Sequence, residues 1–335
     1  MFDKSKCTLC GDCLVRCQYT DYTQEKAIED FKVLIEGGDA EILRQCITCA
    51  ACNEYCREGA NPFDLICELQ EEKGSLPIPD ALLSQISYLE SMPSELIEGD
   101  DNKPLLSLCT TELVLPKGAL QGQMFEGLTI AKGGKYFCYL GVVHLGKVSI
   151  VRENAKRFVD NIASLNKDEV VFLHDDCYTM LTKVVPDYGI EVPFKAIHIM
   201  EYLLDYLKHH QAAVSKLDVR IAYQRPCISR YTPETDAMLD ELFEQLGVER
   251  VQRRHDQEDA LCCGSSLAAY YPDKAARIQQ QNLADAESHG AQAMVFTCPL
   301  CYMTLKKVCR DWSITPIFIT ELCQIALGER PFPSR

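Results

Sequence analysis

Three short stretches decide the fold of this chain: Arg225-Pro226-Cys227, Cys262-Cys263-Gly264 and Cys298-Pro299-Leu300-Cys301. Two adjacent cysteines such as Cys262 and Cys263 cannot easily form a relaxed disulfide with each other. As metal ligands they are well placed, because a Cys-x-x-Cys turn presents two thiolates on one side and a tight turn at Gly264 presents two more. The stretches therefore predict a metal centre with thiolate ligands from segments that are separated by helix and strand.

These stretches resemble the cysteine-rich CCG domain of heterodisulfide reductase and its relatives. The likeness covers roughly the last third of the chain. In that family such cysteines hold a non-cubane 4Fe–4S cluster. The resemblance therefore implies that one cluster is bound by five residues, the CCG cysteines: Cys227, Cys262, Cys263, Cys298 and Cys301.

A second cysteine pattern lies near the N-terminus and occurs twice. Both copies have the spacing Cys-x-x-Cys-x-x-Cys-x-x-x-Cys, first at residues 7–17 and again at residues 46–56. This is the run of bacterial two-cluster ferredoxins, in which the fourth cysteine of each set ligates the other cluster. Zinc sites use one or two Cys-x-x-Cys pairs and have no use for the further cysteines. We therefore predict two 4Fe–4S clusters, with Cys7, Cys10, Cys13 and Cys56 as the cluster-1 cysteines and Cys46, Cys49, Cys52 and Cys17 as the cluster-2 cysteines.

The segment between these two sets has a helical pattern. Residues 24–37 predict a helix that ends at a pair of glycines. Asp39 is expected to cap a second helix, which runs to Cys46. This arrangement resembles the helical ferredoxin domains of succinate dehydrogenase iron–sulfur subunits and of heterodisulfide reductase, and it implies an all-α domain over residues 1–72. Cys67 lies outside the pattern and is expected in the core.

From Pro104 onward the chain contains two copies of one module. Before it, residues 73–103 are predicted to form a linker with one helix, residues 80–90. The first copy is expected to cover residues 104–212 and the second residues 213–335.

A gap-free alignment of residues 138–177 with residues 262–301 shows the repeat. Cys138 then corresponds to Cys262, and Cys177 corresponds to Cys301. The first copy has lost ligands. Tyr139 replaces the second vicinal cysteine, Leu140 replaces the glycine, and His174 replaces the first cysteine of the Cys-x-x-Cys pair. Its remaining cysteine, upstream, is Cys109.

Short β-rich runs end at a cysteine or its replacement in both copies, and helical patterns follow. The expected strands are residues 135–137, 170–173, 219–223 and 293–297, and the expected helices are residues 178–185, 233–246, 273–288 and 302–310. This alternation implies parallel sheets with ligands at their carboxyl edges. The predicted fold class is α+β and multidomain, with an N-terminal all-α ferredoxin-like domain followed by two tandem α/β CCG modules with short parallel sheets.

The eroded first copy retains four residues that could form a tetrahedral zinc site with three sulfurs and one nitrogen: Cys109, Cys138, His174 and Cys177. Two alternatives remain open from the sequence, an empty pocket kept as a scaffold and a smaller iron–sulfur centre.

Charged residues accompany the CCG cysteines. Arg225 and Arg230 flank Cys227 and could tune a cluster or bind an anion. His255 precedes the vicinal pair in a charged loop, where it is either solvated or able to reach a substrate. The last two cysteines, Cys309 and Cys323, are expected to be buried thiols.

Composition limits the possible partners. The chain has 335 residues, of which 47% are hydrophobic and 25% charged, as in a globular protein with two or three domains. A net charge of −15 argues against nucleic-acid binding, which needs clustered Lys and Arg. The 19 cysteines, in a chain without an apolar signal region, indicate metal ligation in a reducing compartment. No apolar run is long enough to span a bilayer. We expect a cytoplasmic protein without direct membrane insertion.

The predicted function is electron transfer within a multi-subunit oxidoreductase, because the order of parts resembles the D subunit of heterodisulfide reductase. Two cubanes would exchange electrons with the CCG-bound cluster. No phosphate loop or dinucleotide fingerprint is present, so the electrons must come from another redox subunit, such as a flavoprotein, a ferredoxin or a membrane subunit. The alternative is a catalytic disulfide reductase acting at the non-cubane cluster. No catalytic residue is predicted.

Overall fold

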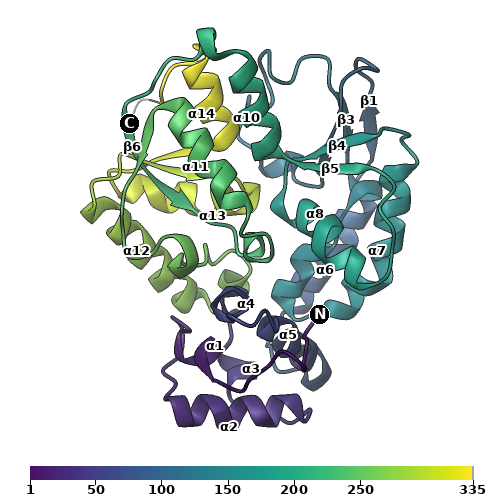
Figure 1. Ribbon diagram of the computed structural model, residues 1–335, viewed down its shortest axis with the longest axis vertical. Coiled ribbons are helices and arrows are strands. Elements are labelled where there is room, and N and C mark those ends of the chain that lie inside the picture. The colour runs from purple at the N-terminus through teal and green to yellow at the C-terminus, as the bar shows by residue number, and fades with distance from the viewer. Residues whose placement is uncertain (334–335) are drawn as a thin grey trace.

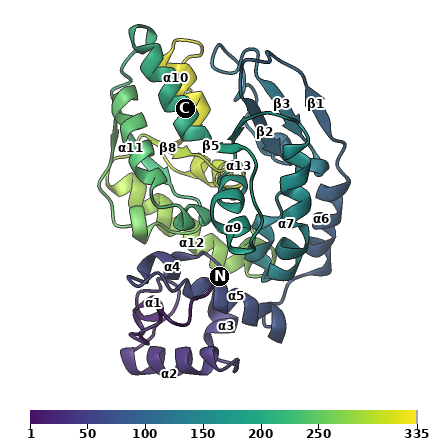
Figure 2. The same cartoon turned by 45° about the vertical axis from the view of Figure 1, so that its right-hand side comes forward.

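The computed structural model describes residues 1–333. Figure 1 shows the N-terminal helices at one end of the molecule and two α/β units side by side above them. The view in Figure 2, turned by 45°, shows the same separation into a helical part and two sheets with their helices.

The N-terminal part contains only helices and loops over its first 73 residues. Its helices are α1 (Asp12–Val15), α2 (Gln24–Ile35), α3 (Ile42–Gln45), α4 (Ala51–Tyr55) and α5 (Pro62–Lys73). They pack around a small apolar core that includes Phe31, Leu34 and Leu43. The predicted helix over residues 24–37 is confirmed, and its N-cap is Thr23, whose hydroxyl accepts a hydrogen bond from the Lys26 amide.

The second helix between the cysteine sets is shorter than expected. It begins at Ile42, with Glu41 as N-cap, so the prediction of Asp39 as its cap is wrong. The carboxylate of Asp39 instead pairs with Arg44 at 2.8 Å. The first turn of this helix therefore has no side-chain cap.

The stretch predicted as a linker is partly built into the first sheet. Helix α6 (Asp80–Ser91) matches the expected helix. Strand β1 (Glu95–Ile97) follows it and pairs antiparallel with β3 (Thr129–Lys132). Residues 80–97 are therefore structural parts of the first α/β unit.

The first sheet has the strand order β1-β3-β2-β4-β5. Its other strands are β2 (Leu105–Cys109), β4 (Glu169–Phe172) and β5 (Lys195–His198), and all its pairs except β1–β3 are parallel. The helices of this unit are α7 (Val148–Ala163), α8 (Asp175–Thr179), a π-helical turn (Met180–Val184), α9 (Val185–Asp187) and α10 (Ile199–His209).

The strand predicted over residues 135–137 is wrong, because Gly134–Tyr136 form a 3₁₀ turn. Gly134 lies so close to α6 that a Cβ atom there would meet the Glu90 carbonyl oxygen at 2.1 Å. The amide of Gly134 donates to the Met92 carbonyl at 3.2 Å instead of joining a sheet. The chain is therefore held against α6 at this point, and the strand is β3 upstream.

The second sheet is wholly parallel, in the order β7-β6-β8-β9. Its strands are β6 (Val219–Gln224), β7 (Val248–Arg250), β8 (Ala293–Phe296) and β9 (Thr315–Phe318). Its helices are α11 (Thr235–Leu246), α12 (Pro272–Ser288), α13 (Pro299–Val308) and α14 (Ile319–Ala326).

The two sheets repeat one pattern. In the first sheet, β2 has β3 on one side and β4 and then β5 on the other. In the second sheet, β6 has β7 on one side and β8 and then β9 on the other, so the strands β2 to β5 correspond in order to β6 to β9. Side chains of both units, such as Leu203 and Leu242, share one apolar core. The internal repeat expected from the cysteine alignment is thus present in the fold. Over the part of the chain that the structure describes, the helices are too short or too polar to cross a membrane.

Candidate metal centres

The CCG cysteines lie beyond the carboxyl ends of two neighbouring parallel strands. Cys227 follows β6, and Cys298 is the N-cap of α13 after β8. The vicinal pair lies in a loop that turns at Gly264. Its φ is +76°, and a Cβ atom at this position would meet the Ala275 Cβ at 3.3 Å, so there is little room for a side chain. The Gly264 amide donates to the Cys262 sulfur at 3.3 Å.

The five CCG thiols meet in a continuous series of contacts. Cys227 contacts Cys262, and Cys263 contacts both Cys262 and Cys301. The Cys301 thiol, with His174, lowers the pKa of Cys298 to about 6 against the opposing effect of burial. The structure therefore brings together all the residues that the sequence assigned to this centre.

All three parts of the chain line the cavity beside these thiols. Its volume is about 70 Å³. The first α/β unit contributes His144, His174 and Asp176, and the N-terminal part contributes Ile47 and Thr48. The His174 Nε2 atom is 3.6 Å from the Cys298 sulfur. The CCG centre is thus enclosed jointly by both copies of the repeat.

The N-terminal cysteines are arranged in two mixed groups. Burial first, and then the thiols of Cys56, Cys10 and Cys7, raise the pKa of Cys13. Cys56 therefore lies with the first three cysteines of the other set.

The second group has the reciprocal arrangement. Burial first, and then the nearby thiol of Cys17, raises the pKa values of Cys46 and Cys49. In each group the structure places a fourth cysteine from the other run, as expected for crossed ligation.

The loops of the two sets share an unusual backbone. Leu9 and Thr48 occupy equivalent positions with φ of 56° and 59°, and Gly11 and Ala50 follow with φ of 81° and 59°. Left-handed φ values in non-glycine residues cost about 1–3 kcal/mol each and collect at functional sites. The same curled loop is therefore formed twice, although only one copy has a glycine.

The spacing of the thiols separates two kinds of site. In residues 1–333 a single group of three candidate ligand atoms lies within 4.8 Å of one another, and it comprises Cys109, Cys138 and Cys177. Tetrahedral zinc with bonds of about 2.3 Å holds its sulfurs about 3.8 Å apart. The N-terminal and CCG thiols are spread more widely, which fits centres with several metal ions.

The cluster-2 cysteines lie directly against the CCG cysteines. Burial raises the pKa of Cys49, and the nearby Cys262 thiol raises it further. The hydrogen bond with Cys262 and burial raise the pKa of Cys227, and the nearby Cys49 thiol adds to this effect. Tyr19 lies between the two groups, where its hydroxyl oxygen accepts a hydrogen bond of 2.9 Å from the Cys262 amide. Cys10 of the cluster-1 group is exposed. The cluster-2 group is therefore the middle one of three.

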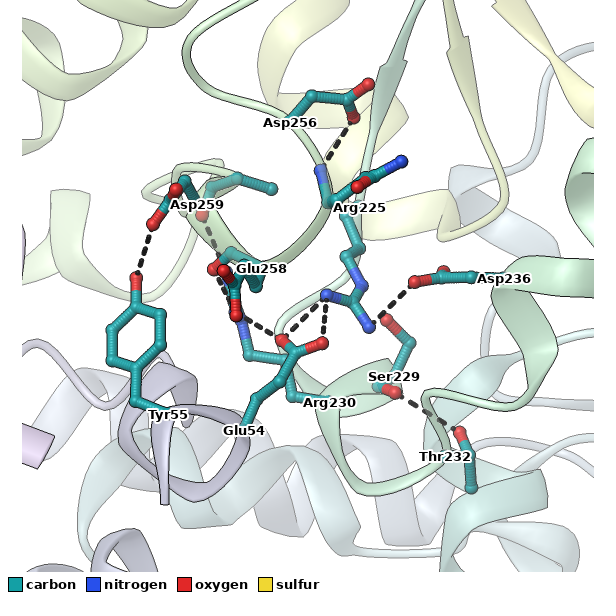
Figure 3. Close-up of polar contacts among 12 residues, drawn as sticks. Glu54, Tyr55, Arg225, Ser229, Arg230, Thr232, Asp236, Asp256, Glu258 and Asp259 are labelled. Carbon is teal, nitrogen blue, oxygen red and sulfur yellow. Dashed lines mark hydrogen bonds and ion pairs between the residues drawn. The ribbon is translucent and has the colours of Figure 1, made fainter. Parts of the chain in front are cut away.

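A buried ionic clamp holds the N-terminal part on the CCG module. Figure 3 shows Glu54 of α4 facing the guanidinium groups of Arg225 and Arg230. Arg225 Nη1 lies 2.8 and 2.7 Å from the two carboxylate oxygens, and Arg230 Nη1 lies 2.8 Å from one of them. Arg225 also pairs with Asp236 at 3.0 Å, and its side chain is 0% exposed. Glu54 stands between Cys52 and Cys56, so the clamp acts on the helix that carries cysteines of both N-terminal groups.

The remaining cysteines of the first α/β unit form the compact site. Cys109, Cys138 and Cys177 are at most 2% exposed. The ring nitrogens of His174 are not within 4.8 Å of all three sulfurs, although the ring contacts the Cys138 thiol. The Tyr139 hydroxyl, at the position of the second vicinal cysteine, bonds to Glu90 at 2.6 Å.

Comparison with known proteins agrees with this geometry. Residues 221–306 match the model of the CCG family, described as a cysteine-rich domain. The chain is 24% identical over 312 residues to the D subunit of the dihydromethanophenazine:CoB–CoM heterodisulfide reductase of Methanosarcina acetivorans, covering 84% of this chain and 74% of that protein. The chain is a relative of the heterodisulfide reductase D subunit. The resemblance inferred from the cysteine pattern is therefore confirmed.

Two further matches extend this picture. The corresponding D subunit of Methanosarcina barkeri is 23% identical over 90% of this chain and 80% of its own length. The B subunit of the fumarate reductase (CoM/CoB) of Methanothermobacter marburgensis is 22% identical, with 81% of this chain and 58% of that protein covered. By name, these homologues of the heterodisulfide reductase-like chain are subunits of reductases, which is consistent with an iron–sulfur redox subunit.

One solved structure has a similar fold. It is a hypothetical protein from Helicobacter pylori with a TM-score of 0.59 and 12% identity. The match covers 90% of this chain and 65% of the other, so the heterodisulfide reductase-like chain spans slightly less than two thirds of that protein.

His255 has a structural role at the junction. It is buried, and its Nδ1 atom lies 3.1 Å from the Gln18 side-chain oxygen, whereas its Nε2 lies 3.0 Å from the Gln281 amide nitrogen. A neutral ring with hydrogen on Nδ1 satisfies both contacts. The expectation of a solvated or substrate-facing His255 is therefore replaced by a role in docking.

Acidification is expected to weaken the folded state through His255. Burial is the largest cause that lowers its pKa below 6.5, Arg254 and Arg253 act in the same direction, and Asp285 opposes them. The unfolded chain therefore binds this proton more readily, and the stabilisation present above pH 6.5 is lost as the pH falls below it.

A His255→Gln variant should lose part of this acid sensitivity, measured as the melting temperature between about pH 5 and 7.5. The matched control is His209→Gln, because His209 is 70% exposed. Equal acid sensitivity in the His255 variant and the wild type would contradict the assignment.

Several residues of these centres were not found from the sequence. Glu54, Tyr19 and Asp176 carry no motif. Arg225 and Arg230 were noted beside Cys227, but nothing in the sequence indicated their shared carboxylate. A buried arginine needs a partner, and that need was the only available signal.

Proposed function

We propose that this chain is an iron–sulfur electron-transfer subunit of a cytoplasmic multi-subunit oxidoreductase. In this proposal residues 1–72 form a ferredoxin domain with two 4Fe–4S clusters on the cluster-1 and cluster-2 cysteines. The CCG cysteines hold a third, non-cubane 4Fe–4S cluster in the module over residues 213–335. Such clusters supply one-electron redox steps.

The observation that carries this proposal is the contact between the cluster-2 and CCG cysteines. Cys49 of the middle group packs in one cluster with Cys227 and Cys262 of the CCG group. The series runs from the group with exposed Cys10, through the middle group, to the enclosed CCG group. A partner redox subunit, such as a flavoprotein, a ferredoxin or a membrane subunit, would dock near Cys10.

The clamp residue Arg230 lies between the two inner groups. Burial is the largest single effect on the pKa of Arg230 and lowers it. The combined effect of Cys49, Glu54 and Cys227 is greater, so the pKa is raised. A fixed cation there stabilises negative charge on either side. Arg230 thus favours the reduced, more negative form of a neighbouring centre.

Replacing Arg230 by glutamine is expected to make the midpoint potential of the middle cluster more negative by on the order of 100 mV. This is the interaction of a unit charge about 7 Å away at an effective dielectric constant of about 20. Spectroelectrochemical titration with EPR detection measures it. Arg230→Lys retains the charge and should shift the potential much less, so equal shifts in both variants would count against the electrostatic role.

Disulfide reduction at the CCG centre is the second candidate, and the specific observation in its favour is the cavity at the thiols. That cavity is about 70 Å³, and a cluster held by the five thiols would occupy it. Cys263, Cys298 and Cys301 are 5%, 6% and 4% exposed, and only Cys227 and Cys262 of this group are partly exposed. Little room then remains for a bulky disulfide, which favours the relay over the reductase.

Metal analysis and EPR of anaerobically purified protein test the proposal. About twelve irons per chain are expected, because three clusters carry four each. A relay should give oxidised-state signals that do not respond to added thiol. A thiol-dependent signal would favour disulfide reduction, and about eight irons would overturn the CCG cluster.

A further inference from the structure

The three buried thiols of the first α/β unit form a site that the relay does not use. Cys109, Cys138 and Cys177 have their sulfur atoms within 4.8 Å of one another. Their exposures are 1%, 2% and 0%. They come from three separate segments of the chain, so the fold converges on this point.

The backbone is strained where it presents these thiols. Cys109 ends β2 with a φ of 54°, at an irregularity in the pairing of β2 with β3. Cys138 precedes Tyr139, which has a φ of 62°. Such conformations cost about 1–3 kcal/mol each and persist where the surroundings fix them. The two strained positions are Cys109 itself and the residue that follows Cys138.

The size of the site fits one metal ion. Sulfur atoms around a single tetrahedral zinc ion lie about 3.8 Å apart. A cluster of several irons spreads its thiolates further, because the iron–iron distances add to the iron–sulfur bonds. Three thiolates and no exposed face are typical of a structural zinc site rather than a catalytic one.

His174 lies beside this group, outside the 4.8 Å spacing of the three sulfurs, and is the candidate for a fourth ligand. It is 4% exposed, and its Nδ1 atom has no hydrogen-bond partner in the described structure. Its ring contacts the Cys138 thiol. Its other nitrogen, Nε2, lies 3.6 Å from Cys298 of the CCG group. A buried imidazole nitrogen without a partner, beside three thiols, is suited to metal ligation.

We propose that Cys109, Cys138, Cys177 and the Nδ1 atom of His174 bind one structural zinc ion, and that this imidazole bridges the zinc site and the CCG centre. His174 and Cys177 belong to the same turn between β4 and α8, which also carries Asp176. Both His174 and Asp176 line the CCG cavity. The zinc ion therefore fixes one wall of that cavity.

Zinc analysis of the full chain, produced anaerobically with both iron and zinc supplied, tests the site. One zinc per chain is expected. Zinc-edge X-ray absorption, to which iron clusters do not contribute, should show about three sulfurs at 2.3 Å and one nitrogen near 2.0 Å. Absence of zinc, another metal in stoichiometric amount, or a shell without three sulfurs would overturn the proposal.

Variants separate the zinc site from the iron clusters. Cys138→Ser should lower zinc content at least tenfold while iron stays at the wild-type value. His174→Ala should keep three sulfurs in the zinc shell and lose the nitrogen. The control is Cys309→Ser, because Cys309 is equally buried but lies elsewhere. Unchanged zinc in Cys138→Ser, or an unchanged nitrogen in His174→Ala, would refute the corresponding ligand. Because zinc and iron are counted separately, failure here leaves the relay proposal independently testable.

Discussion

Replacing Arg225 by methionine is expected to lower the free energy of unfolding by about 3–5 kcal/mol, the cost of removing one partner of a buried ion pair. The Arg225 side chain is 0% exposed and pairs with Glu54 and Asp236 at 2.7 and 3.0 Å. Methionine fills much of the volume but leaves both carboxylates without their shared cation. The measurement is guanidinium unfolding of anaerobic, cluster-loaded protein, followed by circular dichroism.

A surface pair offers the matched control. Arg152 and Glu68 also join the N-terminal part to the first α/β unit, at 3.2 Å, but they are 54% and 41% exposed. Arg152→Met should change stability by less than about 1 kcal/mol. Glu54→Gln combined with Arg225→Met should cost less than the sum of the single changes, because the two residues share one interaction. Equal effects of Arg225→Met and Arg152→Met would show that the clamp is not needed for docking.

Replacing Cys49 by serine is expected to have the largest effect on function. On the relay proposal it removes the middle cluster, so iron should fall from about twelve to about eight per chain. Reduction of the CCG cluster by a donor acting at the cluster-1 group should then fall below detection in stopped-flow experiments. Electrons from the cluster-1 group would have to pass the Cys49 group, because it lies between the other two groups.

Cys67→Ser is the control for this experiment. Cys67 is 1% exposed in the same N-terminal part, and its thiol donates to the Val143 carbonyl oxygen at 3.6 Å. This variant should keep about twelve irons and the wild-type reduction rate. If Cys49→Ser retained rapid reduction of the CCG cluster, electrons would have to enter by another route.

The sequence predicted the centres better than their connections. Cysteine spacing is local information, so the grouping at the second sheet and the repeat of the module could be inferred before the fold was known. The pair Arg225–Glu54 joins residues 171 positions apart, and no local pattern encodes such a contact. The strand over residues 135–137 was wrong because β-propensity there is overridden by the close approach of Gly134 to α6.

The role of His174 illustrates the same limit. The alignment identified it as a replacement for a cysteine in its own module. Its contact with Cys298, 124 positions away, depends on how the two modules pack. Packing of two similar units against each other is set by their shared core, in which residues such as Leu203 and Leu242 meet. Such an interface cannot be inferred from either unit alone.

The ionic clamp also imposes an order on maturation. It holds helix α4 against the CCG module, and in this docked arrangement Cys13 and Cys49 are only 7% and 8% exposed. On the relay proposal, an assembly factor must deliver iron and sulfide to these thiols before the N-terminal helices dock. Docking is then the step that closes the N-terminal thiols off from solvent, and local opening of this junction is the step that would expose them again.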